Sequence, residues 1–448
     1  MTINSVYDIA IVGAGQSGMA CAYELHKLGV GNFIVIEARD RVGGRTVTQD
    51  LGDGAWADGG GQWIGPMQTA VHALADELGA EKFPFFNKGK VWFDFNGTRY
   101  TEEAVPVMSG GTPRSEQLTM MASTVPLDKP WLAPHAQKWD TMSVADWEDE
   151  VGLTPDERAR LELGAAISNG GETRDLSLLY YLYFARSSGS IEVMESAEGG
   201  AQETRITGGT QTLPLKIADI IGHEKIQLNN PVRAISGWDG EGPVTLETGY
   251  GPIRARKVVI AMGPPLAGRI NFQPGLPEKR VKLQQEWPTY AKLIKVHLKY
   301  QTPFWREDGW CGRTATDYPP AVLTVDNSPA DASCGIILIF WSGELKPTER
   351  EQMQEAAAIM AERLGPKALQ PTGYAVYDWG ADPWNEGCVS PLPPGLLTKY
   401  GESLREPVGS LIWAGTEVAE MNTCSIDGAV RAGQAAAIRA AASLVGSW

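Results

Sequence analysis

The chain has 448 residues, which is enough for two or three domain-sized hydrophobic cores. Hydrophobic residues make up 43% and charged residues 21%, a balance that excludes a disordered or fibrous chain and is typical of a globular enzyme. The formal net charge of −15 at pH 7 argues against nucleic acid and anionic membranes as partners, because like charges repel.

The cysteines, histidines and apolar runs narrow the class further. Five cysteines are scattered without a Cys-x-x-Cys pair, and five histidines show no metal-ligand spacing, so we expect a reduced, cytoplasmic protein without a bound metal ion. The longest apolar run, residues 336–341, is far too short to cross a membrane. Residues 1–5 lead directly into the first expected strand, so we expect no signal peptide.

The first motif is a glycine-rich turn between an expected strand and an expected helix. Residues 9–12 form an apolar, β-branched run of the kind that is buried in a parallel sheet. Gly13, Gly15 and Gly18 then form Gly-x-Gly-x-x-Gly, and residues 17–27 continue with helical periodicity. The first glycine permits a tight turn, the second lets the backbone approach a pyrophosphate, and the third lets the helix pack closely on the strand.

A carboxylate follows at the spacing that a dinucleotide site requires. A second expected strand, residues 33–36, ends at Glu37, nineteen residues past Gly18. In dinucleotide-binding sheets, a carboxylate at this spacing binds the ribose. An ordinary charge at the end of a strand is the alternative for Glu37, and the glycine motif before it favours the dinucleotide site.

Two further glycine-containing segments suit a flat ligand that carries a diphosphate. Residues 38–46 read Ala-Arg-Asp-Arg-Val-Gly-Gly-Arg-Thr, in which the paired glycines let the backbone turn close to a ligand and Arg45 can clamp a diphosphate. Residues 58–65 read Asp-Gly-Gly-Gly-Gln-Trp-Ile-Gly, which places a flexible backbone beside a planar aromatic side chain. Such a segment suits a flat ring system.

These two segments resemble the FAD-dependent amine oxidase family, which includes the monoamine and polyamine oxidases. The resemblance implies FAD as cofactor, and an amine and O2 as substrates: the carbon next to nitrogen gives a hydride to flavin N5, water hydrolyses the imine, and O2 becomes H2O2. We therefore expect an α/β flavoprotein of two domains. A Rossmann-like FAD domain, residues 1–80, 205–265 and 386–448, is interrupted by a substrate domain of mixed sheet and helices, residues 81–204 and 266–385.

The resemblance also implies where the cofactor binds. In the family, the position of Val232 contacts the adenine side, and the last helix points its N-terminus at the flavin pyrimidine end, where the helix dipole stabilises negative charge. The expected cofactor-binding residues are Gly13, Gly15, Gly18, Glu37, Ala38, Arg39, Gly44, Arg45, Gly60, Gly61, Gln62, Trp63, Val232, Cys388, Gly415, Glu417, Ser425 and Ile426.

Lys295 is the expected catalytic residue. Residues 290–300 alternate in polarity like a strand, and the pattern alone is equally that of a solvated lysine on a half-buried strand. The phrase Leu293-Ile294-Lys295, followed by Pro-Phe-Trp at 303–305, resembles the monoamine oxidases closely. There the matching lysine sits near flavin N5 and holds a water molecule.

The chain departs from the family pattern in front of the flavin. Family members usually place two aromatic side chains there, but the matching residues are Val389 and Ser425. This loss predicts a bulky or substituted amine as substrate, provided that no tryptophan from elsewhere refills the space. Gln202 matches a glutamine that lines the cavity in monoamine oxidases, with a solvent-facing residue as the alternative. The expected substrate-binding residues are Ile167, Gln202, Trp379, Trp384, Val389 and Ser425.

Several alternatives stay open at this point. Cys388 falls where some family members attach FAD through a thioether, and a buried free thiol is the other possibility. The same flavin motifs serve L-amino-acid oxidases and flavin-dependent desaturases or dehydrogenases, and a substrate carboxylate would require an arginine that faces the cavity. A flavin-binding regulatory protein without turnover is the non-enzyme alternative. A homodimer is a further expectation.

Overall fold

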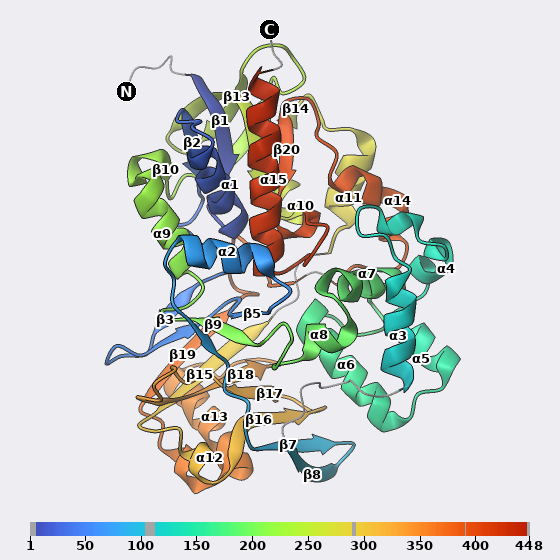
Figure 1. Cartoon of the computed structure of the whole chain (residues 1–448), viewed down its shortest axis with the longest axis vertical. Helices are drawn as coiled ribbons and strands as arrows, with labels where there is room; N and C mark the ends of the chain where they lie inside the picture. Colours follow the sequence, from blue (N-terminus) through green and yellow to red (C-terminus); the bar gives the residue numbers. More distant parts are fainter. Residues whose placement is uncertain (1–5, 104–112, 289–292, 390, 446–448) are drawn as a thin grey trace.

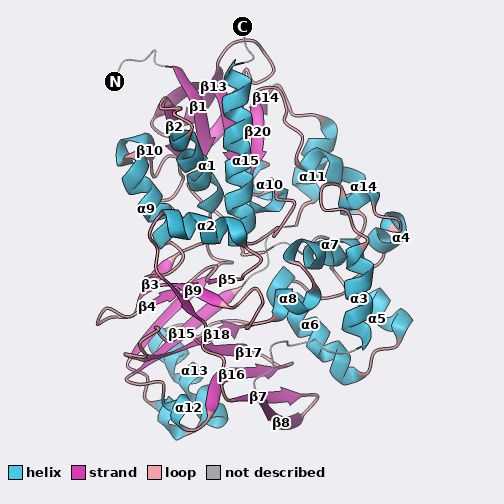
Figure 2. Cartoon of the chain, viewed as in Figure 1, coloured by secondary structure: helices cyan, strands magenta, loops and turns pink. Residues whose placement is uncertain are grey.

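The computed structural model describes residues 6–103, 113–288, 293–389 and 391–445. Two large sheets lie towards opposite ends of the molecule, and a group of helices lies beside the second sheet (Figure 1). Figure 2 shows that each of the two sheets belongs to its own body of the molecule, and that the group beside the second sheet consists mostly of helices. The first sheet draws its strands from three separate stretches of the chain, so the polypeptide crosses repeatedly between the two bodies.

The first sheet has the strand order β10-β2-β1-β13-β12-β11-β14, and β20 also pairs with β13. Val12, the last residue of β1, lies opposite Ile36 on β2 and Ile260 on β13, and these three strands run parallel. Their carboxyl ends therefore share one edge, where ligands bind in sheets of this kind. The bounds are β1 Val6–Val12, β2 Phe33–Ile36, β10 Ile226–Gln227, β11 Val232–Ser236, β12 Val244–Thr248, β13 Gly251–Ala261, β14 Asn271–Gln273 and β20 Leu411–Ala414.

Two long helices, α1 (Gln16–Lys27) and α15 (Ile426–Val445), pack side by side on this sheet (Figure 1). They approach so closely that a Cβ on Gly433 would lie 2.1 Å from the carbonyl oxygen of Ser17. This packing brings the N-termini of both helices to the edge of the sheet where β1 and β20 end. The helices α2 Thr69–Glu77, α9 Thr212–Ile221 and α10 Pro264–Ala267 complete this body.

The second sheet has the order β19-β15-β18-β17-β16-β7-β8. Along β15, Val296 and Leu298 pack with helix α13 on one face, so Lys295 points to the opposite face. The bounds are β7 Lys90–Phe95, β8 Thr98–Glu103, β15 Ile294–Tyr300, β16 Trp310–Thr316, β17 Ala321–Asp326, β18 Gly335–Trp341, β19 Gly373–Asp378, α12 Phe304–Glu307 and α13 Glu349–Leu364.

Short strands and a helical group connect the two bodies. The short strands pair as β3 with β4 and as β5-β9-β6, close to the middle of the molecule (Figure 1). Their bounds are β3 Thr48–Asp50, β4 Trp56–Asp58, β5 Trp63–Ile64, β6 Lys82–Pro84 and β9 Thr204–Ile206. The helices are α3 Pro113–Ser123, α4 Ala136–Thr141, α5 Val144–Val151, α6 Pro155–Asn169, α7 Leu178–Ser188, α8 Ile191–Glu195, α11 Glu278–Glu286 and α14 Leu396–Tyr400.

Two stretches fold differently from what their local sequence predicts. Residues 226–232 look like one strand but form the end of β10, a loop and the start of β11, because Asn229 has φ 54° and Pro231 offers no N–H to a ladder. The proline-rich stretch 103–135 looks irregular, yet it contains α3, whose Leu118 and Ala122 are buried at helical spacing. Residues 104–112 of that stretch lie outside the described residues.

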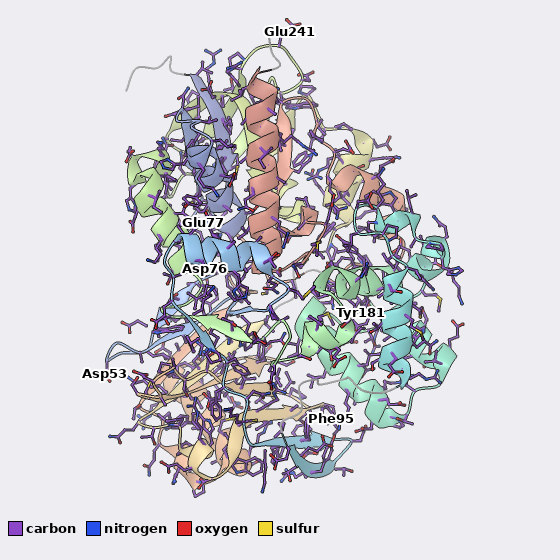
Figure 3. All side chains as sticks on the ribbon, viewed as in Figure 1. Asp53, Asp76, Glu77, Phe95, Tyr181 and Glu241 are labelled. Atoms are coloured by element: carbon purple, nitrogen blue, oxygen red, sulfur yellow. The ribbon has the colours of Figure 1, made fainter. Side chains whose placement is uncertain are left out.

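The surface carries the negative charge, as Asp53, Asp76, Glu77 and Glu241 show by projecting outward, whereas Tyr181 lies inside (Figure 3). In the described ranges no helix combines the length and the apolar character needed to cross a membrane. Among these same residues, no group of three or more histidine, cysteine, aspartate or glutamate side chains could hold a metal ion.

Candidate active site

The glycine-rich turn after β1 has the geometry that its spacing predicts. Gly13 has φ 104°, and a Cβ there would lie 2.8 Å from the carbonyl oxygen of Ala261. A Cβ on Gly18 would lie 1.9 Å from the carbonyl oxygen of Gly13, so Gly18 permits the close packing of helix on strand. Gly15 precedes the first residue of α1 and lines the main cavity of the molecule, so a ligand there meets the helix N-terminus.

Glu37 is held rigidly at the carboxyl end of β2. Its Oε2 accepts a hydrogen bond from the backbone N–H of Ala14 at 2.7 Å, and its Oε1 accepts one from the N–H of Arg39 at 2.9 Å. Its backbone carbonyl also accepts from Asn230, in the loop that separates β10 from β11. That loop brings Val232 to the same end of the cavity, so the break between β10 and β11 contributes a residue to the site.

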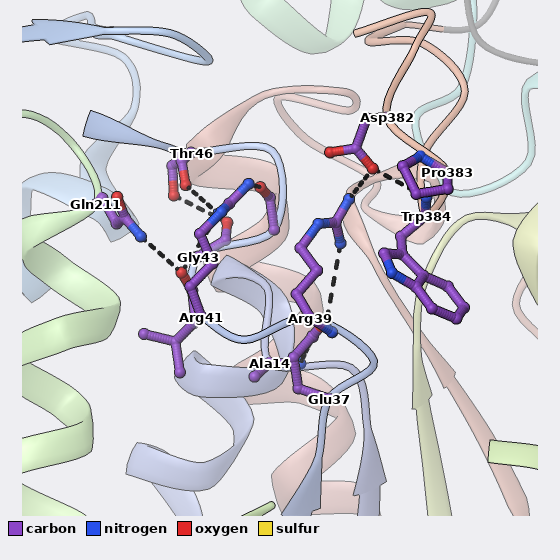
Figure 4. A network of polar contacts seen from close by, with 12 residues as sticks. Ala14, Glu37, Arg39, Arg41, Gly43, Thr46, Gln211, Asp382, Pro383 and Trp384 are labelled. Carbon is purple, nitrogen blue, oxygen red and sulfur yellow. Dashed lines mark hydrogen bonds and ion pairs between the residues drawn. The ribbon is translucent and has the colours of Figure 1, made fainter. Parts of the chain in front are cut away.

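A second network closes this end of the cavity (Figure 4). The Arg39 guanidinium bonds Asp382 at 2.8 Å, and the Tyr377 hydroxyl and the Trp384 N–H both donate to the same carboxylate at 2.9 Å. Trp384, 38% exposed, therefore lines the cavity near Glu37. This is the end away from Lys295.

The two tryptophans expected at the substrate lie elsewhere. Trp384 lies at the Arg39 end of the cavity, because its backbone N–H donates a hydrogen bond to the Asp382 carboxylate. Trp379 is fully buried and does not line the cavity, because its Nε1 donates to the carbonyl of Gly59 at 2.8 Å and its ring packs beside Gly60. Neither indole refills the space that Val389 and Ser425 leave.

Arg45 joins three separate segments at the middle of the cavity. Its guanidinium bonds Glu417 at 2.6 Å and donates to the carbonyl of Cys388 at 3.0 Å. The backbone of Gly60 lies so close to that of Arg45 that a Cβ on Gly60 would lie 2.0 Å from the Arg45 carbonyl oxygen. The Cys388 thiol also lies in the lining, where burial raises its pKa and the charges of Arg45 and Lys295 oppose the shift.

Lys295 is buried, with 4% of its surface exposed, and not solvated. Its ammonium donates to the carbonyl of Gly60 at 2.6 Å and to Oε1 of Gln62 at 2.8 Å. Burial lowers the pKa of Lys295 from 10.5 to about 8, against the opposing effect of the Asp58 carboxylate. Lys295 thus holds two groups of the glycine-rich loop while it lines the cavity.

Four of the other expected substrate residues line the same cavity as Lys295. Ile167 on α6, Gln202 and the pair Val389 and Ser425 all line the same cavity of about 470 Å³. Gln202 is held by a hydrogen bond to the Met194 carbonyl at 2.9 Å. The expected cofactor residues that line it are Gly13, Gly15, Glu37, Ala38, Arg39, Gly44, Arg45, Gly60, Gly61, Gln62, Trp63, Val232, Cys388, Gly415, Ser425 and Ile426.

Two expected cofactor residues do not line the cavity themselves, and several residues that do line it were not expected from the sequence. Gly18 supports Gly13, and Glu417 supports Arg45. The Ser425 hydroxyl accepts from the N–H of Gly428 and so caps α15, a pattern that the Ser-x-x-Gly spacing contains. The unexpected lining residues include three charged side chains, Glu195, Arg269 and Arg313, and the aromatic side chains Phe85, Phe184 and Phe340.

The buried ammonium makes a testable contribution to stability. Below pH 8 the folded and unfolded chains both carry the Lys295 proton, so the folded state bears the full cost of burying the charge. Between about pH 8 and pH 10.5 the unfolded chain binds more protons, so the stability contributed by this group rises with pH. We expect the difference in unfolding free energy between the wild type and Lys295→Met to increase from pH 7 to pH 10 in urea unfolding. Lys88→Met, at an exposed lysine, is the control. If the difference in unfolding free energy for Lys295→Met changes no more with pH than the difference for this control, Lys295 is not buried as a charged group.

Comparisons with known proteins agree with this geometry. The family model described as flavin containing amine oxidoreductase matches residues 16–441. The protein AofH of Mycobacterium tuberculosis, described as a flavin-containing monoamine oxidase, is 36% identical over 98% of this chain and 97% of its own. Amine oxidase [flavin-containing] B of Sus scrofa is 32% identical over 97% of this chain and 86% of its own.

Solved structures show the same fold over 98% of the chain. Cyclohexylamine oxidase from Brevibacterium oxydans superposes with a TM-score of 0.90 at 32% identity, covering 98% of this chain and 100% of its own. A wild-type putrescine oxidase bound to putrescine superposes with a TM-score of 0.87 at 32% identity, covering 98% and 99%. The expected fold class, a two-domain α/β flavoprotein, is confirmed.

The family resemblance read from the sequence is confirmed as well. Membership implies FAD as cofactor and an amine and O2 as reactants. The chain belongs to the flavin-containing amine oxidoreductase family and is a flavin-dependent amine oxidase, an oxidoreductase that acts on CH–NH2 groups.

Proposed function

We propose that this enzyme oxidises a bulky or substituted amine to an imine, which water hydrolyses to a carbonyl compound and ammonia or a smaller amine, while O2 becomes H2O2. One continuous cavity supports this proposal. It runs from Glu37 and Arg39, past Arg45, to Lys295 and the open space beside Val389. In the proposal, a dinucleotide and a substrate share this cavity and together displace water from their meeting point.

The residues present fit FAD. Gly13 and Gly44 have positive φ, and the backbone at Gly13 leaves no room for a side chain, as a turn that cradles a diphosphate requires. In the proposal, Glu37 binds the ribose, Arg45 and the N-terminus of α1 face the diphosphate, and the N-terminus of α15 faces the pyrimidine end. The proposed FAD domain comprises 1–80, 205–265 and 386–448, and the substrate domain comprises 81–204 and 266–385.

The protein's own groups orient the amine and keep it neutral. Bound FAD supplies the hydride acceptor, so no general base is needed. The apolar, buried wall around Lys295 disfavours a charged amine, which raises the fraction in the reactive neutral form. The Lys295 ammonium has three donors: two bind Gly60 and Gln62, and the third makes a long contact of 3.4 Å with the Asp58 carbonyl. In the proposal, Lys295 is the catalytic residue and this third donor holds a water molecule.

The proposal of a bulky substrate depends on the missing aromatic pair. Val389 and Ser425 line the cavity, and the Ser425 hydroxyl is turned towards the backbone of α15. Trp379 and Trp384 lie elsewhere, so the space between the two positions is not refilled by either. A substituted nitrogen or a larger ring can occupy it.

The decisive experiment is anaerobic reduction of the flavin. Purified enzyme mixed with a panel of amines without O2 should lose its flavin absorbance, and cyclohexylamine or an N-methylated amine should act faster than benzylamine. Admission of O2 should restore the colour with one H2O2 per turnover. A flavin that no amine reduces would support a regulatory flavoprotein instead.

Gly15→Val should remove FAD from the protein. A valine at the start of α1 would project into the cavity where the pyrophosphate is proposed to bind. We expect a colourless protein whose circular dichroism matches the wild type, while Gly31→Val, at a glycine with nothing near its Cβ, stays yellow. Yellow Gly15→Val protein would contradict the assignment.

Acid precipitation of the wild type tests the thioether at Cys388, because tethered flavin stays with the pellet.

Val389→Tyr and Ser425→Tyr, singly and together, should favour slim amines. Each tyrosine narrows the space in front of the proposed flavin position. We expect kcat/KM for benzylamine to rise and kcat/KM for bulky amines to fall, most strongly in the double variant. An equal response of both substrate classes would show that these positions do not shape the pocket.

A further inference from the structure

A chain of buried side-chain hydrogen bonds starts at Lys295 and leads away from the cavity. The Lys295 ammonium donates to Oε1 of Gln62 at 2.8 Å, and Nε2 of Gln62 donates to Oδ1 of Asn327 at 2.9 Å. Lys295 and Gln62 line the cavity, whereas Asn327 is fully buried and does not line it. Asn327 is therefore connected to the cavity through Gln62.

The hydrogen-bonding chemistry of Lys295 fixes the direction of this chain. An ammonium group can only donate, so Gln62 must present its carbonyl oxygen to Lys295. The amide nitrogen of Gln62 then faces Asn327, and Asn327 must present its own carbonyl oxygen to accept the bond. A side chain without an acceptor at position 327 would leave the Gln62 nitrogen buried and unpaired, which disfavours this orientation of Gln62. The acceptor on Asn327 thus keeps the Gln62 oxygen on the ammonium.

The backbone on both sides of Asn327 holds its side chain in place. Asn327 directly follows β17, and its N–H donates to the Ile336 carbonyl of β18 at 2.7 Å. Its own carbonyl accepts a hydrogen bond from Nη1 of Arg205 at 2.9 Å, and Nη1 also donates to the Ser328 carbonyl at 3.1 Å. Because Arg205 is buried, water does not compete for this contact. The acceptor for Gln62 is therefore fixed to the second sheet.

The charged and titratable groups around Lys295 make the neutral acceptors important. Burial lowers the pKa of Lys295 to about 8; the Asp58 carboxylate opposes this shift, and the Arg205 guanidinium adds to it. Asp58 also lies 3.6 Å from Arg205, so its charge is shared between two cations. Burial raises the pKa of the Cys388 thiol and lowers the pKa of His297, so both groups are neutral near pH 7. The carbonyl oxygens that contact the ammonium therefore help to decide its direction and its charge.

We propose that Asn327 is a positioning residue for the reaction: through Gln62 it fixes the direction of the Lys295 ammonium at the reacting end of the cavity. The inference rests on the proposed function, in which Lys295 is the catalytic residue. Asn327 touches neither substrate nor cofactor, so its effect passes through Lys295. A substitution at Asn327 should therefore matter only while Lys295 is present. It should also lower the pH at which Lys295 loses its proton, because a hydrogen bond to the charged form favours that form.

The first test is a double-mutant cycle on the holoenzyme, with the amine that reduces the wild-type flavin fastest. Stopped-flow absorbance gives the rate constants for anaerobic flavin reduction and for reoxidation by O2 in the wild type, Asn327→Leu, Lys295→Met and the double variant. Asn327→Leu should slow, by about tenfold, whichever step Lys295→Met slows, because a hydrogen bond to a buried charge is lost. In the Lys295→Met background the same substitution should change that rate constant by less than about twofold. Effects that simply multiply overturn the inference.

The second test needs no turnover. The difference in unfolding free energy between a protein and its Lys295→Met counterpart rises with pH above the pKa of the folded-state lysine. In the wild type this rise should begin near pH 8, and in Asn327→Leu it should begin about one pH unit lower. Urea unfolding from pH 6 to pH 10 measures both onsets. An unchanged onset in folded Asn327→Leu overturns the inference.

A conservative variant and a matched control separate positioning from general destabilisation. Asn327→Asp keeps an oxygen acceptor for Gln62 and should restore the rate constant to within about twofold of the wild type. Thr324→Val removes a buried hydroxyl from β17, on the opposite face of the sheet, where Thr324 lies opposite Ile339 and donates to the Gly312 carbonyl. This control should keep the wild-type rate constants and onset. Asn327→Asp as slow as Asn327→Leu, or an equal loss in Thr324→Val, overturns the inference.

The outcomes also separate this inference from the proposed function. Flavin content and Tm confirm folding of every variant, and if Asn327→Leu does not fold, Asn327→Ala removes the same acceptor. If Lys295→Met is slow and the folded Asn327 variant is as fast as the wild type, only the inference fails. If Lys295→Met keeps the wild-type rate constants, the catalytic role of Lys295 and the inference both fail, while amine oxidation stands. A flavin that no amine reduces overturns amine oxidation and the inference together.

Discussion

The geometry of the site depends on how the loop of residues 58–62 is held between the two sheets. The buried ammonium of Lys295 reaches from the second sheet to the Gly60 carbonyl and the Gln62 side chain. Trp379, at the end of β19, donates to the neighbouring Gly59 carbonyl. A buried charge is tolerated only where hydrogen bonds compensate it, so any shift between the sheets would be costly. The wall of the cavity at Lys295 is therefore kept in one arrangement.

The opposite end of the cavity is closed by a contact of the same kind. The segment after β19 returns from the second sheet to the first, and Asp382 in this segment pairs with Arg39 beside the Glu37 carboxylate (Figure 4). The hydroxyl of Tyr377, near the end of strand β19, donates to the Asp382 carboxylate. Both ends of one elongated enclosure are thus fixed by polar contacts between residues more than two hundred positions apart.

Strand β15 shows how one short segment serves stability and chemistry together. Its alternation buries Val296 and Leu298 against α13 and turns Lys295 towards the cavity. The same alternation on the neighbouring strands continues the wall to Phe340 and Arg313. A rigid sheet spaces its side chains by fixed intervals, so the residues that line the cavity keep their separations.

The sequence by itself determined the dinucleotide turn, the Glu37 carboxylate and the family, because these depend on local spacing that any chain with this function must keep. It also indicated Lys295, through a phrase of neighbouring residues. Only the tertiary structure decided that Trp379 and Trp384 lie away from the reacting end and that Arg313 and Glu195 face the cavity. The positions of these side chains depend on pairings between strands and helices that are distant in the sequence. The periodicity of the sequence indicates on which face of an element a side chain lies, but not which residues cover that face.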